Sequence, residues 1–198
     1  MKKLALTDFA KYRYPSALEL SPDGRYLTFA LKEVDSEGDG YRWNLWLYDL
    51  ERRESRQITR GDDQRQAVWE DNTHILYKTT EPDEALRARG FEEEWTVYHR
   101  LNVCTGEESE AFRLPMSVSG LWKMDEGRYV FTGETHLDRP NLLELTGQAL
   151  EKELVRRQQT KGYKVLTELP LCENGVGMFN QTRNTLFLYL EDAGEYRR

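Results

Sequence analysis

The sequence has few of the residues that build disulfide frameworks. It contains two cysteines, Cys104 and Cys172, among its 198 residues. They lie in unrelated contexts without Cys-x-x-Cys spacing, and two are too few to cross-link a secreted protein of this size. We therefore expect reduced, partly buried thiols and a cytoplasmic location.

Histidine is equally scarce, with His74, His99 and His136 far apart in the chain. No two of them have the close spacing that directs paired imidazoles onto one metal ion. Gly175–Val176–Gly177 lacks the Gly-Lys-Ser/Thr that opens a phosphate-binding helix, so we expect a turn there. The sequence thus predicts no metal site and no cofactor, and the histidines are expected to be surface or strand residues.

Positive charge and long apolar runs are also lacking. Lys and Arg number 28 against 35 Asp and Glu, giving a formal net charge of -7. Because phosphate backbones are bound by dense Lys/Arg surfaces, we expect no nucleic-acid partner. The apolar start Leu4–Leu6 is shorter than the roughly 7 to 15 residues of a signal-peptide core. No other run reaches membrane-spanning length, so no membrane partner is expected.

Strand-forming residues and a repeated pattern are what the chain does contain. Aromatic residues make up 12% of it, which suits half-buried strands. In the first copy of the pattern, Ala17–Leu20 leads through the turn Ser21–Gly24 into Tyr26–Leu31, and Asn44–Leu50 and Ser55–Thr59 follow. Proline presets φ in such a turn, and glycine tolerates a positive φ. This copy predicts a four-stranded antiparallel meander.

The same order of strands and turns recurs twice. The strands of the second copy are expected at Gln66–Trp69, His74–Lys78, Trp95–Val103 and Glu110–Leu114. Those of the third are expected at Gly120–Met124, Arg128–Thr132 and Thr185–Leu190, with a fourth beginning at Glu195. The turn aspartates Asp23, Asp71 and Asp125 recur at intervals close to the roughly 40 to 50 residues of a propeller blade.

This recurrence predicts an all-β fold, a partial β-propeller of about three four-stranded antiparallel blades with a short helical insertion in the third. Within one propeller domain spanning residues 1–198, blade 1 covers about 12–61, blade 2 about 64–116 and blade 3 about 118–198. Thin sheets leave both faces apolar and therefore stack radially. A β-sandwich is the alternative, because it also alternates strands with turns.

Two insertions interrupt the repeat. Pro82–Glu94, in the second copy, is charged and predicts a short helix or a mobile loop. In the third copy, apolar residues at helical spacing from Leu142 onward predict a helical insert at 139–162, with Asp138 or Pro140 at its start and Gly162 at its end.

The four strand tryptophans, Trp46, Trp69, Trp95 and Trp122, are expected to pack between blades. A peptide-binding aromatic face would require at least one of them to be exposed. Because closed propellers have at least about four blades, we expect the chain to be part of a longer protein. An exposed blade edge could then support a homo-oligomer.

Several motifs point to one family. Ser21–Leu27 together with Asn44–Tyr48 resembles the first blade of the amino-terminal propeller of prolyl oligopeptidase-type serine peptidases. Further segments are similar to the acylaminoacyl peptidase and dipeptidyl aminopeptidase branch: Glu94–Tyr98, Tyr163–Pro170, Asn174–Gly177 and Asn180–Arg183. Leu171–Cys172 departs from that branch, in which aromatic residues are expected after the proline.

The resemblance implies a non-catalytic propeller segment of a serine-type oligopeptidase or aminopeptidase. Such a segment gates substrate access to, and docks on, a C-terminal α/β-hydrolase domain of the parent chain, which this sequence lacks. The nucleophile elbow Gly-x-Ser-x-Gly is absent, since Ser117–Gly120 lacks the first glycine of that motif. We therefore predict no catalytic residue and no activity of the chain alone. A stand-alone TolB-type or WD-like propeller that binds a protein partner is the alternative.

The acidic run Glu92, Glu93 and Glu94 is the candidate substrate-binding site. Paired carboxylates can hold the amino terminus of a peptide by charge-assisted hydrogen bonds, and the resemblance to dipeptidyl peptidases implies such a role. Solvated charges at the end of a loop are the alternative interpretation.

Overall fold

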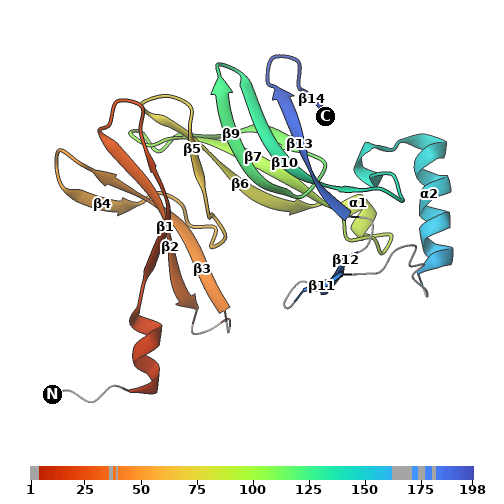
Figure 1. The fold of residues 1–198 in the computed structure, drawn as a ribbon, viewed down its shortest axis with the longest axis horizontal. Coiled ribbons are helices and arrows are strands. Elements are labelled where there is room, and N and C mark those ends of the chain that lie inside the picture. The colour runs from red at the N-terminus through yellow and green to blue at the C-terminus, as the bar shows by residue number, and fades with distance from the viewer. Residues whose placement is uncertain (1–4, 36–37, 39, 162–170, 174–176, 180–181) are drawn as a thin grey trace. The chain divides into compact units, whose positions relative to one another are not determined.

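The computed structural model of the protein describes residues 5–35, 38, 40–161, 171–173, 177–179 and 182–198. The chain divides into two compact units. The first comprises Met1–Thr80, Val97–Arg113 and Trp122–Glu126, and the second comprises Glu81–Thr96, Leu114–Leu121 and Gly127–Arg198. Strands are the dominant element in both units (Figure 1).

The first sheet is an antiparallel meander in the order β1-β2-β3-β4. A short 3-10 helix η1 precedes its strands, and the elements are η1 (Leu6–Lys11), β1 (Tyr14–Leu20), β2 (Tyr26–Asp35), β3 (Gly40–Asp49) and β4 (Glu54–Gln57). In the turn after β1, Asp23 Oδ1 accepts hydrogen bonds from the Ser21 hydroxyl at 2.6 Å and the Arg25 amide at 3.1 Å. Gly24 has a φ of 72°, which only glycine adopts freely. The predicted turn chemistry therefore closes this hairpin.

The second sheet repeats the arrangement in the order β5-β6-β7-β8. Its strands are β5 (Ala67–Trp69), β6 (His74–Pro82), β7 (Glu94–Asn102) and β8 (Glu108–Leu114), and the short helix α1 (Glu84–Arg87) stands between β6 and β7. Asp71 Oδ1 accepts the amides of Thr73 and His74, each at 2.7 Å. Burial raises the pKa of Asp71, but these hydrogen bonds outweigh it and lower the pKa to about 2. Asp71 thus closes this turn in the same way that Asp23 closes the turn of the first sheet.

The third sheet joins strands that are far apart in the sequence, in the order β14-β13-β10-β9. Its strands are β9 (Val118–Asp125), β10 (Arg128–His136), β13 (Thr182–Leu190) and β14 (Glu195–Arg197). β10 and β13 pair without a break from Arg128 opposite Leu190 to His136 opposite Thr182. The chain therefore forms three four-stranded antiparallel sheets, which confirms the predicted fold class.

The helical insertion of the third sheet lies between β10 and β13. It contains the 3-10 helix η2 (Leu142–Glu144), the helix α2 (Gly147–Thr160) and a two-stranded sheet of β11 (Leu171–Glu173) and β12 (Gly177–Phe179). The long helix begins at Gly147, after Thr146, and the start predicted at Asp138 or Pro140 is wrong. Leu145 has extended backbone angles, which separate η2 from α2.

Some sequence-based predictions fall on residues outside the described part of the chain. These are the helix end at Gly162 and the family-like segment Tyr163–Pro170. Residues 174–176 of the segment Asn174–Gly177 and residues 180–181 of the segment Asn180–Arg183 also lie outside it. The side chain of Cys172 also lies outside the described part.

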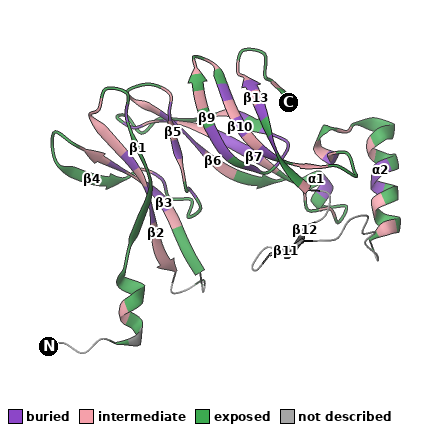
Figure 2. Ribbon diagram, viewed as in Figure 1, coloured by how far each residue is buried: buried purple, intermediate pink, exposed green. Residues whose placement is uncertain are grey.

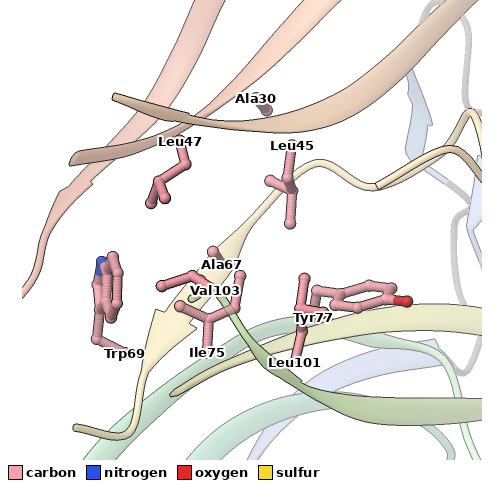
Figure 3. Close-up of a cluster of buried hydrophobic side chains, with 9 residues drawn as sticks. All are labelled: Ala30, Leu45, Leu47, Ala67, Trp69, Ile75, Tyr77, Leu101 and Val103. Atoms are coloured by element: carbon pink, nitrogen blue, oxygen red, sulfur yellow. The ribbon is translucent and has the colours of Figure 1, made fainter. Parts of the chain in front are cut away.

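The core of the first unit lies between the first two sheets. Figure 3 shows Ala30, Leu45 and Leu47 of the first sheet facing side chains of the second. The other members of this cluster are Ala67, Trp69, Ile75, Tyr77 and Leu101 of the second sheet and Val103 in the turn after β7. Burying one large apolar side chain contributes roughly 1.5–3 kcal/mol. Sheet-on-sheet packing is therefore what stabilises this unit.

Burial is uneven across the first sheet. β1 is exposed along its whole length, whereas β3 carries the buried residues Leu45 and Leu47 (Figure 2).

In the described residues, no helix is both long and apolar enough to span a membrane.

The tryptophans are buried to different extents. Trp69 is 8% exposed in the core, and Trp46 and Trp95 are half-buried. Trp122 is 51% exposed, so its predicted packing between blades is wrong. Because successive residues of a strand point to opposite faces, the buried Leu121 leaves Trp122 on the other face of β9.

Replacing Leu45 by alanine tests the core between the first two sheets. Leu45 is fully buried, so Leu45→Ala is expected to lower the free energy of unfolding by about 2–5 kcal/mol. The control Leu50→Ala removes a side chain that is 42% exposed and is expected to cost less than about 0.5 kcal/mol. Urea denaturation measures both values, and equal losses would contradict this packing.

Candidate functional site

The two insertions pack together within the second unit. Leu86 of α1, Leu142 of η2 and Leu154 of α2 form a buried apolar cluster. Its partly buried neighbours are Phe91, Leu143, Leu145 and Leu150. The insertion of the second sheet and that of the third therefore share one small core.

Polar contacts reinforce this packing. The carboxylate of Asp83 caps α1 by accepting the Leu86 amide at 3.0 Å and also accepts Trp95 Nε1–H at 3.1 Å. Arg89 donates both terminal nitrogens to the carboxylate of Glu151 on α2, each at 2.7 Å. Such a bidentate pair fixes orientation as well as distance. The loop after α1 is thereby joined to α2.

An open cavity of about 520 Å³ lies beside these insertions in the second unit. Its charged lining consists of Glu92, Glu93, Glu94, Glu134, Glu144, Arg139 and Arg198. Its apolar lining includes Pro115, Met116, Leu143, Phe187 and Tyr196. Carboxylates outnumber guanidinium groups, so the cavity favours a positively charged ligand with an apolar part.

All three residues of the predicted acidic site line this cavity. Glu93 pairs with Arg157 of α2 at 2.7 Å, and its charge is thereby compensated. Glu92 and Glu94 are exposed, and within the described residues neither carboxylate takes part in an ion pair. The structure therefore leaves Glu92 and Glu94 as the two members of the run that are open to a ligand.

Two further titratable groups of the lining have shifted pKa values. The hydroxyl of Tyr196 on β14 donates a hydrogen bond to Glu144, and burial raises the pKa of that carboxyl. Burial also lowers the pKa of His136, and the Arg139 guanidinium adds to this effect. Arg139 Nη2 lies 3.1 Å from His136 Nε2, and because a guanidinium only donates, that nitrogen accepts. Burial and the Arg139 guanidinium therefore both disfavour the protonated form of the His136 imidazole.

The other two histidines lie on the second sheet. His74 Nδ1 is 2.9 Å from an Asp71 carboxylate oxygen, and His99 Nε2 is 2.9 Å from the Thr79 hydroxyl. In the ranges that the structure describes, no three His, Cys, Asp or Glu side chains converge as metal ligands.

Cys104 is a free thiol, and it is exposed, so its predicted partial burial is wrong. It follows the end of β7, where Asn102 Oδ1 accepts its amide at 2.9 Å in a turn. A turn residue has no strand partner to cover it, which explains the exposure.

Sequence reasoning missed the remainder of the cavity lining, including Glu134, His136, Glu144 and Tyr196. One signal could have located them. Both insertions separate the second and third strands of their sheets, so they emerge at equivalent ends of neighbouring repeats. That equivalence predicts contact between them.

Comparison with known proteins shows the fold. No protein-family model and no curated protein matches the sequence. Among solved structures, the acylaminoacyl peptidase of Pyrococcus horikoshii is similar with a TM-score of 0.64 and 12% identity, over 97% of this chain and 26% of that one. The apo AtxE2 isopeptidase is similar with a TM-score of 0.53 and 14% identity, over 91% of this chain and 28% of that one.

The β-propeller domain of the Trilobed protease from Pyrococcus furiosus, described as having an open velcro topology, gives a TM-score of 0.50 and 11% identity. That match covers 96% of this chain and 43% of the other. This chain spans about a quarter of the length of the two peptidases. Its fold is that of a partial β-propeller.

The raised pKa of Glu144 predicts how pH changes stability. A carboxyl that holds its proton more tightly in the folded state stabilises the fold as pH falls through its raised pKa, and its ionised form costs stability above that pKa. Glu144→Gln removes this ionisation and can still accept from Tyr196. We expect Glu144→Gln to gain unfolding free energy over wild type at pH 8 and to lose that gain by pH 4.

Urea denaturation at the two pH values measures this difference. Glu126→Gln, which neutralises an exposed turn carboxylate outside the cavity, serves as the control. A Glu144→Gln effect that is the same at both pH values contradicts the assignment.

Proposed function

We propose that this chain is the propeller segment of a serine peptidase of the prolyl oligopeptidase type. It restricts which peptides reach a C-terminal α/β-hydrolase domain of the same parent chain and provides the surface on which that domain docks. The hydrolase domain supplies the chemistry, and the propeller supplies selection.

The observation that carries this proposal is the structural likeness to acylaminoacyl peptidase over 97% of the chain. The AtxE2 isopeptidase and the Trilobed protease propeller support the same assignment. The sequence contains no Gly-x-Ser-x-Gly, and the proposal places the catalytic serine in the hydrolase domain.

The cavity of the second unit suggests how selection operates. Glu92 and Glu94 would accept hydrogen bonds from the ammonium group of a peptide's amino terminus. Phe187, Leu143 and Met116 offer an apolar surface for the side chains that follow.

The coding sequence downstream of Arg198 tests the parent assignment. We expect a Gly-x-Ser-x-Gly motif followed in order by an aspartate and a histidine, which is the chain order of α/β-hydrolases. Further blade repeats that end at a stop codon without that motif would instead support a stand-alone interaction propeller.

Peptide binding to the 198-residue chain tests the role of the acidic run. Calorimetry with Ala-Ala-Phe amide should show binding that Glu92→Gln and Glu94→Gln each weaken by roughly 10- to 150-fold, since one charge-assisted hydrogen bond contributes about 1.5–3 kcal/mol. N-acetylated Ala-Ala-Phe amide has no ammonium group. It should bind to the wild-type chain at least as weakly as the free peptide binds to either variant.

Glu84→Gln is the matched control, because it neutralises an exposed carboxylate on α1 outside the cavity. It is expected to leave the affinity unchanged. Equal binding of the free and acetylated peptides, or a loss with Glu84→Gln as large as with Glu92→Gln, would remove the acidic run from the proposal.

A further inference from the structure

Arg157 occupies a central position among the elements around the cavity. It lies on α2, and its side chain is 11% exposed. Nη1 donates to Glu93 Oε1 at 2.7 Å, Nη2 donates to the Pro140 carbonyl at 2.6 Å, and Nε donates to Glu153 Oε1 at 3.1 Å. One planar guanidinium therefore joins α2 to two separate segments of the cavity lining.

The helix holds this guanidinium in place. Glu153, one turn before Arg157, is buried and also accepts two hydrogen bonds from Arg156, at 2.6 and 2.7 Å. Those bonds from Arg156, opposed by burial and assisted by Arg157, hold the pKa of Glu153 below its ordinary value. Glu153 is therefore a fixed anion that orients Arg157.

The acidic run is held at its middle residue. The carboxylate of Glu93 is bound to Arg157, and its backbone carbonyl accepts the Asp83 amide at 2.8 Å. Fixing the centre of a three-residue run determines where the side chains on either side of it emerge. Those side chains are Glu92 and Glu94, which both line the cavity.

We propose that Arg157 is a positioning residue, whose hold on Glu93 and on the Pro140 carbonyl orients Glu92 and Glu94 for a cationic ligand. Arg157 acts through Glu93 and does not itself contact the ligand. The ligand part of this inference rests on the proposed function, in which the two glutamates bind a peptide's amino group. The orienting part rests on the observed contacts alone.

Charge and position predict opposite effects when Arg157 is removed. Arg157→Met deletes a positive charge and frees Glu93, so the lining becomes more negative. Long-range attraction alone would then strengthen the binding of a cation. A positioning role predicts weaker binding, because the acidic run loses its fixed geometry. The sign of the change therefore separates the two roles.

The experiment uses the 198-residue chain with Arg157→Met, Arg157→Lys and Glu93→Gln. Hydrogen–deuterium exchange over residues 88–94 reports the ordering of the run without any ligand. Calorimetry with Ala-Ala-Phe amide reports binding. We expect Arg157→Met to speed exchange over 88–94 by about tenfold, with no change in β2 and β3, which belong to the other unit.

Binding should weaken by about tenfold in Arg157→Met, and Arg157→Lys should regain part of it, since lysine restores the charge but not the planar fork. Glu93→Gln keeps the other contacts of Arg157 and should show the same changes in a milder form, which covers the case that Arg157→Met does not fold. Unchanged exchange over 88–94, or binding equal to or tighter than wild type, overturns the proposal. If wild type binds no peptide while the exchange data agree, the peptide site fails and the orienting role of Arg157 stands.

Discussion

A sheet of four strands cannot cover its own faces, and this constraint underlies the structure. Each repeat of the chain forms such a sheet, and in the first two repeats a local aspartate turn closes the first hairpin. The turns connect adjacent strands, but they do not cover the apolar faces of the sheets. In the first unit, stability comes from the apolar side chains of the first sheet that pack on those of the second.

The same constraint explains why the insertions can line a cavity. With stacked sheets as the scaffold, segments inserted between strands are free to diverge from the repeat. The two insertions of this chain use that freedom to form a second small core around Leu86, Leu142 and Leu154. Beside it, Arg157 and Glu153 supply fixed charges, and the cavity takes its acidic character from the run that begins at Glu92.

The sequence predicted the features that depend on local chemistry. Turns at Asp23 and Asp71 were predictable because their hydrogen bonds join residues two or three positions apart. The start of α2 was not, because apolar spacing continues through Leu145, where the backbone is extended. The acidic run was identified as a candidate from its charges. Its pairing with Arg157 was not foreseen, because an ion pair between residues distant in sequence leaves no mark in local spacing.

Nuclear Overhauser contacts between methyl groups test the stacking of sheets most directly. Stacked sheets predict contacts from Leu45 and Leu47 on β3 to Ile75 and Leu101 of the neighbouring sheet and to Val103 after β7, with no backbone pairing between β4 and β5. A single continuous sheet, in which β4 and β5 exchange backbone hydrogen bonds and these methyl contacts are missing, would contradict it.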